Sequence, residues 1–125
     1  MDVENLADIN VENGYFKTVY KEKFVIFKDD NVIILQSEFQ SKIMSANSED
    51  IFIDGTFYSA PKCVYQILII RVNIKDTRQY STTCFVLCNN KKEELYYKVL
   101  SEISKNMNFV NRKYLNLKEY ILILN

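Results

Sequence analysis

A carboxylate stands near the end of a short apolar run in the stretch Ile51-Phe52-Ile53-Asp54-Gly55-Thr56-Phe57. A second apolar run follows at residues 64–70, so a buried sheet is expected to pass beneath Asp54. Carboxylate oxygens are ligands that Mg²⁺ accepts, provided that several of them converge. Glu49 and Asp50 precede the run and are expected to lie too far from Asp54 or to point elsewhere. Asp54 is therefore the candidate catalytic and metal-binding residue.

The Asp54-Gly55 pair also fits a second interpretation, because Asp-Gly between short apolar runs is typical of a two-residue hairpin turn. On that interpretation residues 51–53 pair with residues 56–58, and Asp54 only shapes the turn. Three residues on each side make a very short hairpin, which favours a strand that continues through Phe57. Both interpretations stay open at this point, and they imply different functions.

The composition excludes several kinds of catalytic site. The chain has no histidine, so neither a Ser/His nor a Cys/His nucleophile pair can form. Its three cysteines, Cys63, Cys84 and Cys88, contain no CxxC pair, and a structural zinc site is not expected. Cys84 and Cys88 are four residues apart in a strand-like stretch and are expected to be buried thiols on one face. Any chemistry has to rely on carboxylates, Lys, Tyr or a metal ion.

Length and charge narrow the class of protein further. A chain of 125 residues, 48% of them hydrophobic, is expected to form one compact core with little room for linkers. Residues 1–50 carry ten acidic and five basic side chains, whereas residues 51–125 carry six and eleven. This basic excess is compatible with contact to a phosphate backbone, but it is small and spread out, which favours a solvated surface. The sequence shows no membrane span and no signal peptide at residues 1–13, so an intracellular location is expected.

A hairpin and a short helix are expected before Asp54. Apolar, β-branched runs on both sides of residues 28–31 predict a β-hairpin over residues 23–35. Ser37 stands three residues before Gln40, which is the spacing of a capping box, so a helix is expected from there to about residue 46. Three residues are expected on the buried face of this helix: Phe39, Ile43 and Met44.

An antiparallel meander and one crossover are expected from residue 51 onward. The predicted strands are residues 51–57, 64–74 and 81–88, and the nearly continuous apolar character of the second predicts a central strand buried on both faces. Apolar residues at helical spacing predict a helix over 91–107. The run 119–124 predicts a last strand, parallel to the first across a right-handed connection. The expected fold class is α+β, with a mixed sheet that contains an antiparallel three-strand meander and one crossover helix.

The residues around Asp54 resemble a known protein family. The string Ile53-Asp54-Gly55-Thr56-Phe57, followed by Ala60-Pro61-Lys62 and Tyr65-Gln66-Ile67, is similar to the first-carboxylate block of Mutator-like element (MULE) transposases. The hairpin and helix before this block and the segment Phe85 to Tyr96 after it resemble the neighbouring parts of the same family. The resemblance covers about residues 24–125.

The resemblance implies a truncated ribonuclease H-like fold. Residues 51–125 would form the N-terminal part of that domain. The hairpin and short helix, residues 23–50, would precede this core, and residues 1–22 would form an N-terminal segment. In the family, the aspartate on the first strand begins a DDE-type triad that holds two Mg²⁺ ions for phosphoryl transfer on DNA. The resemblance therefore implies that Asp54 corresponds to the first carboxylate.

The second carboxylate of the family is missing from this sequence. It ends the fourth strand in those proteins, whereas Ile123, Leu124 and Asn125 stand at the corresponding positions here, and a third acid would come from a later helix. We therefore expect a truncated or degenerate transposase-like domain without catalytic activity. Mg²⁺ is the cofactor of the family, but none is expected for this chain, where Asp54 alone would bind a metal weakly at best.

The resemblance also implies partners and a location. DNA is the implied partner and the nucleus the implied location, whereas nothing in the sequence indicates a membrane or a small-molecule substrate. The alternative is a small α+β interaction module unrelated to transposition, in which Asp54-Gly55 is only a turn. The offset between Asp54 and the fourth-strand position favours the transposase-like interpretation.

Overall fold

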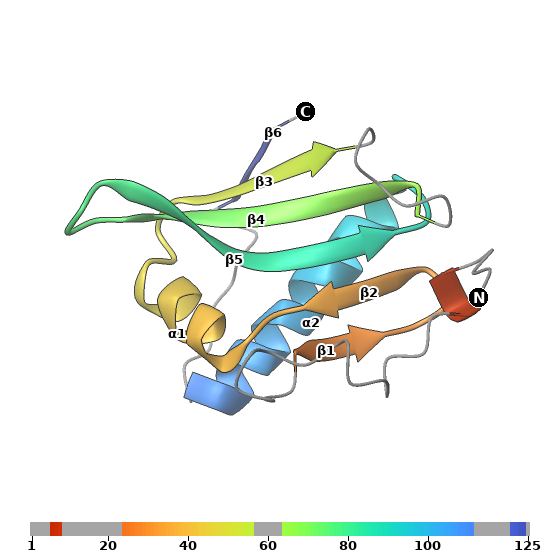
Figure 1. Ribbon diagram of the computed structural model, residues 1–125, viewed down its shortest axis with the longest axis horizontal. Helices are drawn as coiled ribbons and strands as arrows, with labels where there is room; N and C mark the ends of the chain where they lie inside the picture. The colour runs from red at the N-terminus through yellow and green to blue at the C-terminus, as the bar shows by residue number, and fades with distance from the viewer. Residues whose placement is uncertain (1–5, 9–23, 57–63, 112–120, 125) are drawn as a thin grey trace.

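The computed structural model describes residues 6–8, 24–56, 64–111 and 121–124 (Figure 1). In chain order, the elements are η1 (Leu6–Asp8), β1 (Val25–Lys28), β2 (Val32–Leu35), α1 (Glu38–Ala46), β3 (Ile51–Thr56), β4 (Gln66–Ile74), β5 (Gln79–Cys88), α2 (Glu93–Asn111) and β6 (Ile121–Leu124). The chain is therefore an α+β protein, as expected from the sequence.

Five of the strands form an antiparallel sheet in the order β1-β2-β5-β4-β3. The predicted meander of β3, β4 and β5 is confirmed in its order and its direction. The predicted hairpin is confirmed as well, and it is part of the same sheet, because β2 pairs with residues 85–88 of β5. The sheet thus continues from β5 into the hairpin, on the side of β5 away from β4, for which the sequence pattern predicted no partner strand.

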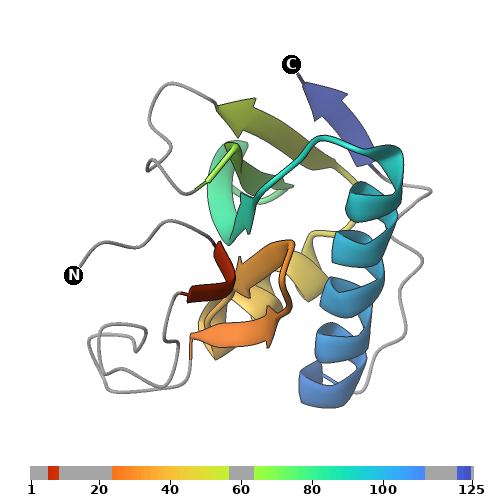
Figure 2. The same ribbon diagram turned by 90° about the vertical axis from the view of Figure 1, so that its right-hand side faces the viewer.

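The strand β6 lies on the other side of β3 and runs parallel to it, with Ile51 opposite Ile121 and Asp54 opposite Leu124. The chain reaches this position through α2, which follows β5. Figure 2 shows α2 running along one side of the sheet, with α1 on the same side. The two helices contact each other. The predicted second helix is confirmed, and it extends four residues beyond its expected end at residue 107.

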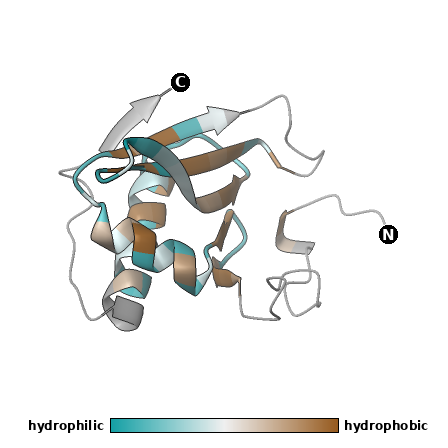
Figure 3. Cartoon of the chain, turned by 60° about the vertical axis from the view of Figure 1, so that its left-hand side comes forward, coloured by the Kyte–Doolittle hydropathy of each residue, from teal (hydrophilic) through white to brown (hydrophobic). Residues whose placement is uncertain are grey.

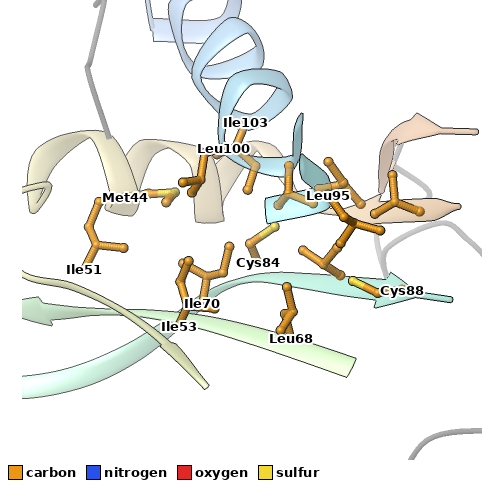
Figure 4. Packing of buried hydrophobic residues seen from close by; sticks show 14 of the residues in the cluster. Met44, Ile51, Ile53, Leu68, Ile70, Cys84, Cys88, Leu95, Leu100 and Ile103 are labelled. Carbon is orange, nitrogen blue, oxygen red and sulfur yellow. The ribbon is translucent and has the colours of Figure 1, made fainter. Parts of the chain in front are cut away.

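The main core lies between the sheet and these two helices (Figure 4). Alternate residues of the strands face the helices and are buried: Ile51, Ile53, Leu68, Ile70, Val72, Cys84, Val86 and Cys88. The helices contribute buried residues in return: Met44, Leu95, Val99, Leu100, Ile103 and Met107. Full burial of one such aliphatic side chain contributes about 1.5–3 kcal/mol, so this layer dominates the stability of the fold.

The prediction that β4 is buried on both faces is wrong. Leu68, Ile70 and Val72 are buried against the helices, whereas Ile69 is half-buried and Arg71 is exposed on the opposite face. The cause is that both described helices lie on one face of the sheet. Among the described residues, a smaller buried cluster covers part of the other face: Leu6, Val25, Ile33 and Val64. We call this second face the open face.

The helix α1 begins as the sequence predicts. Ser37 is its N-cap, its hydroxyl oxygen accepts a hydrogen bond from the backbone N–H of Gln40, and the Gln40 side chain accepts one from the backbone N–H of Ser37. Met44 is buried and Ile43 packs partly against the core. The expected burial of Phe39 is wrong, because its side chain is 69% exposed. The helix is rotated so that Ser41 and Ser45 face inward instead.

Hydrophobic residues are concentrated on the strands, and the turn between β4 and β5 is hydrophilic (Figure 3). None of the helices in the described ranges has the length and apolar character needed to cross a lipid bilayer.

Candidate functional site on the open face

Asp54 lies inside β3, in extended backbone between Ile69 of β4 and Leu124 of β6. Its neighbour Ile53 faces the helices and is buried, so alternation places Asp54 on the open face, where it is half-buried. β3 continues through Gly55 to Thr56, all paired with β4. The interpretation of Asp54-Gly55 as a tight hairpin turn is therefore wrong.

Gly55 is favoured by a close approach from the next strand and not by a turn. It faces the helix side, and a β-carbon at this position would lie 3.0 Å from Oε1 of Gln66 and 3.5 Å from Cδ2 of Leu68. Gln66 is almost completely buried, with 1% of its surface exposed. The absence of a side chain at Gly55 therefore makes room for the amide of Gln66 on the face of the sheet that packs against the helices.

The Gln66 amide in turn connects β4 to the first turn of α2. Its Nε2 donates hydrogen bonds to the backbone oxygen of Asn90, at 3.1 Å, and to the hydroxyl of Tyr96, at 2.9 Å. A buried amide with satisfied donors fixes the position of the groups it joins. Gly55, Gln66 and Tyr96 thus hold the strand of Asp54 in place from the helix side.

A pocket of about 470 Å³ opens beside Asp54 on the open face. Its lining comes from three neighbouring strands: Phe52 and Asp54 of β3, Ile69 and Arg71 of β4, and Tyr80 of β5. The Phe52 and Tyr80 rings meet edge to face, with their centroids 5.2 Å apart and their planes at 74°. The Arg71 side chain is exposed, and its Nε lies 3.5 Å from Oγ1 of Thr82. The described lining of the pocket thus combines one carboxylate, one guanidinium and two aromatic rings.

A β-bulge in β5 brings Tyr80 to this pocket. Ile70 pairs with Cys84 whereas Arg71 pairs with Thr82, so Thr83 is an extra residue between the two pairs. The buried Thr83 hydroxyl donates a hydrogen bond of 3.1 Å to the backbone oxygen of Ile70. One extra residue reverses the alternation of the strand beyond it, because side chains alternate with a period of two. Without the bulge, Tyr80 would face the helices.

The other acids near β3 do not join Asp54. Glu49 forms a salt bridge with Lys75, and the backbone oxygen of Asp50 accepts a hydrogen bond from Asn73 at 3.2 Å. Both residues therefore lie at the opposite end of β3. Four residues of extended chain separate Asp50 from Asp54, or about 13 Å at roughly 3.3 Å per residue. One metal ion cannot contact carboxylates separated by that distance.

The described residues do not fit a two-metal site. Within residues 6–8, 24–56, 64–111 and 121–124, no group of three or more Cys, Asp or Glu side chains is close enough to hold a metal ion. The backbone neighbour of Asp54 on β6 is Leu124, whose side chain carries no ligand atom. Asp54 is thus the single acid placed at this point of the described sheet, and Mg²⁺ requires several oxygen ligands.

Sequence reasoning identified Asp54 but missed the residues around it. Phe52 is two residues before Asp54, so strand alternation was a usable signal for a shared face. Arg71 is the one charged residue within β4, which was a signal that one face of this strand meets solvent. Tyr80 lies outside the expected strand 81–88, and its position depends on the bulge at Thr83.

Comparison of the chain with protein-family models, with curated protein sequences and with solved structures found no significant match in any of the three.

Proposed function

We propose that this chain is the N-terminal part of a ribonuclease H-like domain of the MULE transposase type, degenerate at its catalytic site and without nuclease or transposase activity of its own. The observation that carries the proposal is the position of Asp54. It lies in the interior of β3, between the antiparallel β4 and the parallel β6, with its side chain on the open face. The resemblance implies a first-strand carboxylate that lies beside the strand expected to carry the second ligand, and β6 is the strand in that position here.

Two further observations support the proposal. The arrangement of an antiparallel meander, a crossing helix and a parallel strand beside Asp54 is the one that the resemblance implies. In addition, Gly55 and Gln66 belong to two separate blocks of the resemblance, and the glycine accommodates the amide of the glutamine. The occurrence of this glycine and this glutamine together thus has a structural reason, namely the packing of β3 against β4.

DNA as a partner and a nuclear location follow from the same resemblance. Mg²⁺ is not proposed as a cofactor, because a single carboxylate with a leucine as its neighbour on β6 does not make a two-metal site. The proposed role is therefore that of a transposase-derived domain that contacts DNA without cutting it.

A plasmid-nicking assay tests the absence of activity. We expect purified protein to leave supercoiled plasmid intact in the presence of Mg²⁺ or Mn²⁺. Metal-dependent nicking that disappears in Asp54→Asn would show that additional ligands complete the site, and the proposal of a degenerate site would then be withdrawn.

A carboxylate introduced on β6 directly opposite Asp54 tests the proposed geometry. Leu124→Asp places an acid opposite Asp54 on β6, whereas Leu122→Asp, its matched control, places one opposite Phe52. We expect Mn²⁺ to broaden the amide NMR signals around Asp54 in Leu124→Asp but not in Leu122→Asp, and Asp54→Asn to abolish the effect. Equal broadening in both variants, or broadening that survives Asp54→Asn, would contradict the proposed correspondence of Asp54 to a first-strand metal ligand.

A further inference from the structure

The pocket beside Asp54 offers groups that recognise a planar ring and an anion together. Phe52, Ile69 and Tyr80 give it an aromatic and aliphatic lining, and Arg71 and Asp54 are its charged members. Its volume of about 470 Å³ lies within the range of roughly 300–1,000 Å³ found for ligand pockets. A ligand that fits must therefore combine ring surface with at least one charged group.

The aromatic part of the pocket can support a base. Tyr80 is 61% exposed, and its ring contacts Phe52 edge to face, so one side of the ring is supported while much of its surface stays accessible. Stacking of a nucleic-acid base on an aromatic side chain is tolerant of sequence and contributes about 1–3 kcal/mol per base. Several nucleic-acid-binding domains present such rings on an open β-sheet face.

The two charged residues of the pocket favour one orientation of a bound nucleotide. The exposed Arg71 guanidinium is a donor of planar geometry that suits a phosphate. Asp54 repels phosphate, but its oxygens can accept hydrogen bonds from an exocyclic amine of a base, as acidic side chains do with cytosine N4. Phosphate toward Arg71 and amine toward Asp54 is therefore the favourable orientation.

The exposure of the site favours a nucleic-acid strand over a free nucleotide as the ligand. Small-molecule pockets usually enclose about 70–90% of their ligand, whereas here the lining comes from one face of three strands and Tyr80 stays largely exposed. A site that covers a ligand from one side gains affinity when neighbouring units of a polymer also bind.

We infer that this pocket binds one nucleotide of a single-stranded nucleic acid, with the base against Tyr80 and Phe52, the phosphate at Arg71 and the base amine at Asp54. This inference rests on the proposed function only for the choice of DNA as the nucleic acid. It requires no metal ion, so it can be tested in the presence of EDTA.

Fluorescence anisotropy with short labelled oligodeoxycytidylate and oligothymidylate strands tests the inference. We expect Tyr80→Ala to weaken binding of the cytidylate strand roughly 5- to 150-fold, Tyr80→Phe to retain it, and Arg71→Gln to weaken it more than Arg71→Lys. The wild-type protein should bind cytidylate more tightly than thymidylate, because thymine has no exocyclic amine, and Asp54→Asn should reduce that preference.

Matched variants on the helix side control for general effects of charge and aromatic area. Lys105→Gln removes an exposed cation of α2, with 71% of its side chain accessible, and Phe39→Ala removes an exposed ring of α1. Both should leave the affinity within twofold of wild type. Thermal unfolding of each variant shows which ones are folded, and the comparison of Tyr80→Phe with Tyr80→Ala remains informative because this side chain is largely exposed.

Three results would overturn the inference: no binding of either strand by the wild-type protein at low salt, equal losses in Lys105→Gln and Arg71→Gln, or full competition by free deoxycytidine monophosphate at the same nucleotide concentration. The outcome is separable from that of the proposed function. Binding that depends on Tyr80 and Arg71 in EDTA supports the nucleotide pocket even when Leu124→Asp gains no Mn²⁺ site. A Mn²⁺ site in Leu124→Asp without such binding supports the transposase-like geometry alone.

Discussion

Oε1 of Gln66 lies 3.0 Å from the point where a β-carbon on Gly55 would stand. This distance is shorter than ordinary van der Waals contact, so a β-carbon on residue 55 would require the Gln66 amide to shift by a few tenths of an ångström. Gln66 cannot move away without cost, because its amide also donates to Asn90 and Tyr96. The two residues thus form one packing unit that joins β3, β4 and the start of α2.

Gly55→Ala is expected to destabilise the protein by about 1–3 kcal/mol, because the added methyl group forces the buried amide from its position. The restriction of the unfolded chain by alanine offsets about 0.4–1 kcal/mol of this cost. Urea unfolding measures the net difference in the free energy of unfolding.

A double-mutant cycle identifies the cause of that loss. In a Gln66→Ala background, where the crowding atom is absent, Gly55→Ala should cost much less than it does in the wild-type protein. Additive effects of the two substitutions would mean that the packing of Gly55 against Gln66 is not the source of the destabilisation.

Asp54 and Ile53 should respond to substitution in opposite ways, although they are adjacent. Asp54→Asn changes a half-buried side chain on the open face and is expected to alter the free energy of unfolding by no more than about 0.5 kcal/mol. Ile53→Ala empties a position that is 1% exposed and should cost about 2–5 kcal/mol. Thermal unfolding of both variants measures the two changes in stability. A large loss of stability in Asp54→Asn would contradict the prediction and show that the carboxylate stabilises the fold.

Asp29 links the β1–β2 turn to α2 and makes stability depend on pH. Its Oδ1 accepts hydrogen bonds of 2.8 Å from the backbone N–H groups of Asn31 and Val32, and its Oδ2 forms a salt bridge with Lys98. Lys98 also lies over the Phe27 ring, 5.4 Å from its centroid. Burial raises the pKa of Asp29, but the hydrogen bonds from Lys98, Asn31 and Val32 outweigh it, and the pKa is lower than its ordinary value.

A carboxyl group with a lowered pKa in the folded protein stabilises it above the pKa of the unfolded chain, near 3.9. That contribution is lost as the pH falls through the lower, folded pKa. We therefore expect Asp29→Asn to destabilise by about 0.2–1 kcal/mol at neutral pH, with a difference that shrinks below about pH 4. Urea unfolding of Asp29→Asn and of the wild-type protein across a pH series measures this difference, and a difference that stays constant down to about pH 3 would contradict the role of the Asp29 carboxylate.

The thiols of Cys84 and Cys88 are expected to be unreactive in the folded protein. Both are free and buried, and burial raises the pKa of Cys84 far above its ordinary value and that of Cys88 to about 12. Thiolates are the reactive form, so neither should react with a disulfide reagent at about pH 8. Cys63 lies outside the described residues, and the experiment therefore uses Cys63→Ser. Two thiols should react after unfolding and none before, and rapid reaction of the native variant would contradict their burial.

Local features of the fold could be predicted because the residues that determine them are close in sequence. The capping box of Ser37 and Gln40 is one example, and the β1–β2 hairpin around Asp29 is another. The ambiguity of Asp54-Gly55 could not be resolved locally, because the deciding contact is made by Gln66 on the next strand. A glycine after an aspartate has the same appearance in a turn and in a crowded strand.

The open face could not be predicted because it depends on which face the helices cover. An apolar run such as β4 does not show whether one or both of its faces are buried. The charged residue Arg71 within it was the one indication that only one face is buried. The bulge at Thr83 has no marker among its Ser and Thr neighbours, and the orientation of Tyr80 follows from it. The pocket residues other than Asp54 thus depend on tertiary structure.

The pairing of β6 with β3 has a consequence for the order of assembly. It joins Ile51 to Ile121, whereas β3, β4 and β5 are connected to one another by short links along the chain. Contacts between distant residues form late, because closing a long loop costs entropy before any contact compensates for it. The antiparallel strands can therefore assemble first, with β6 added after α2 has docked. In hydrogen exchange, the β3 amides that face β6 should lose protection before those that face β4, so the edge beside Asp54 would open before the antiparallel strands next to it separate.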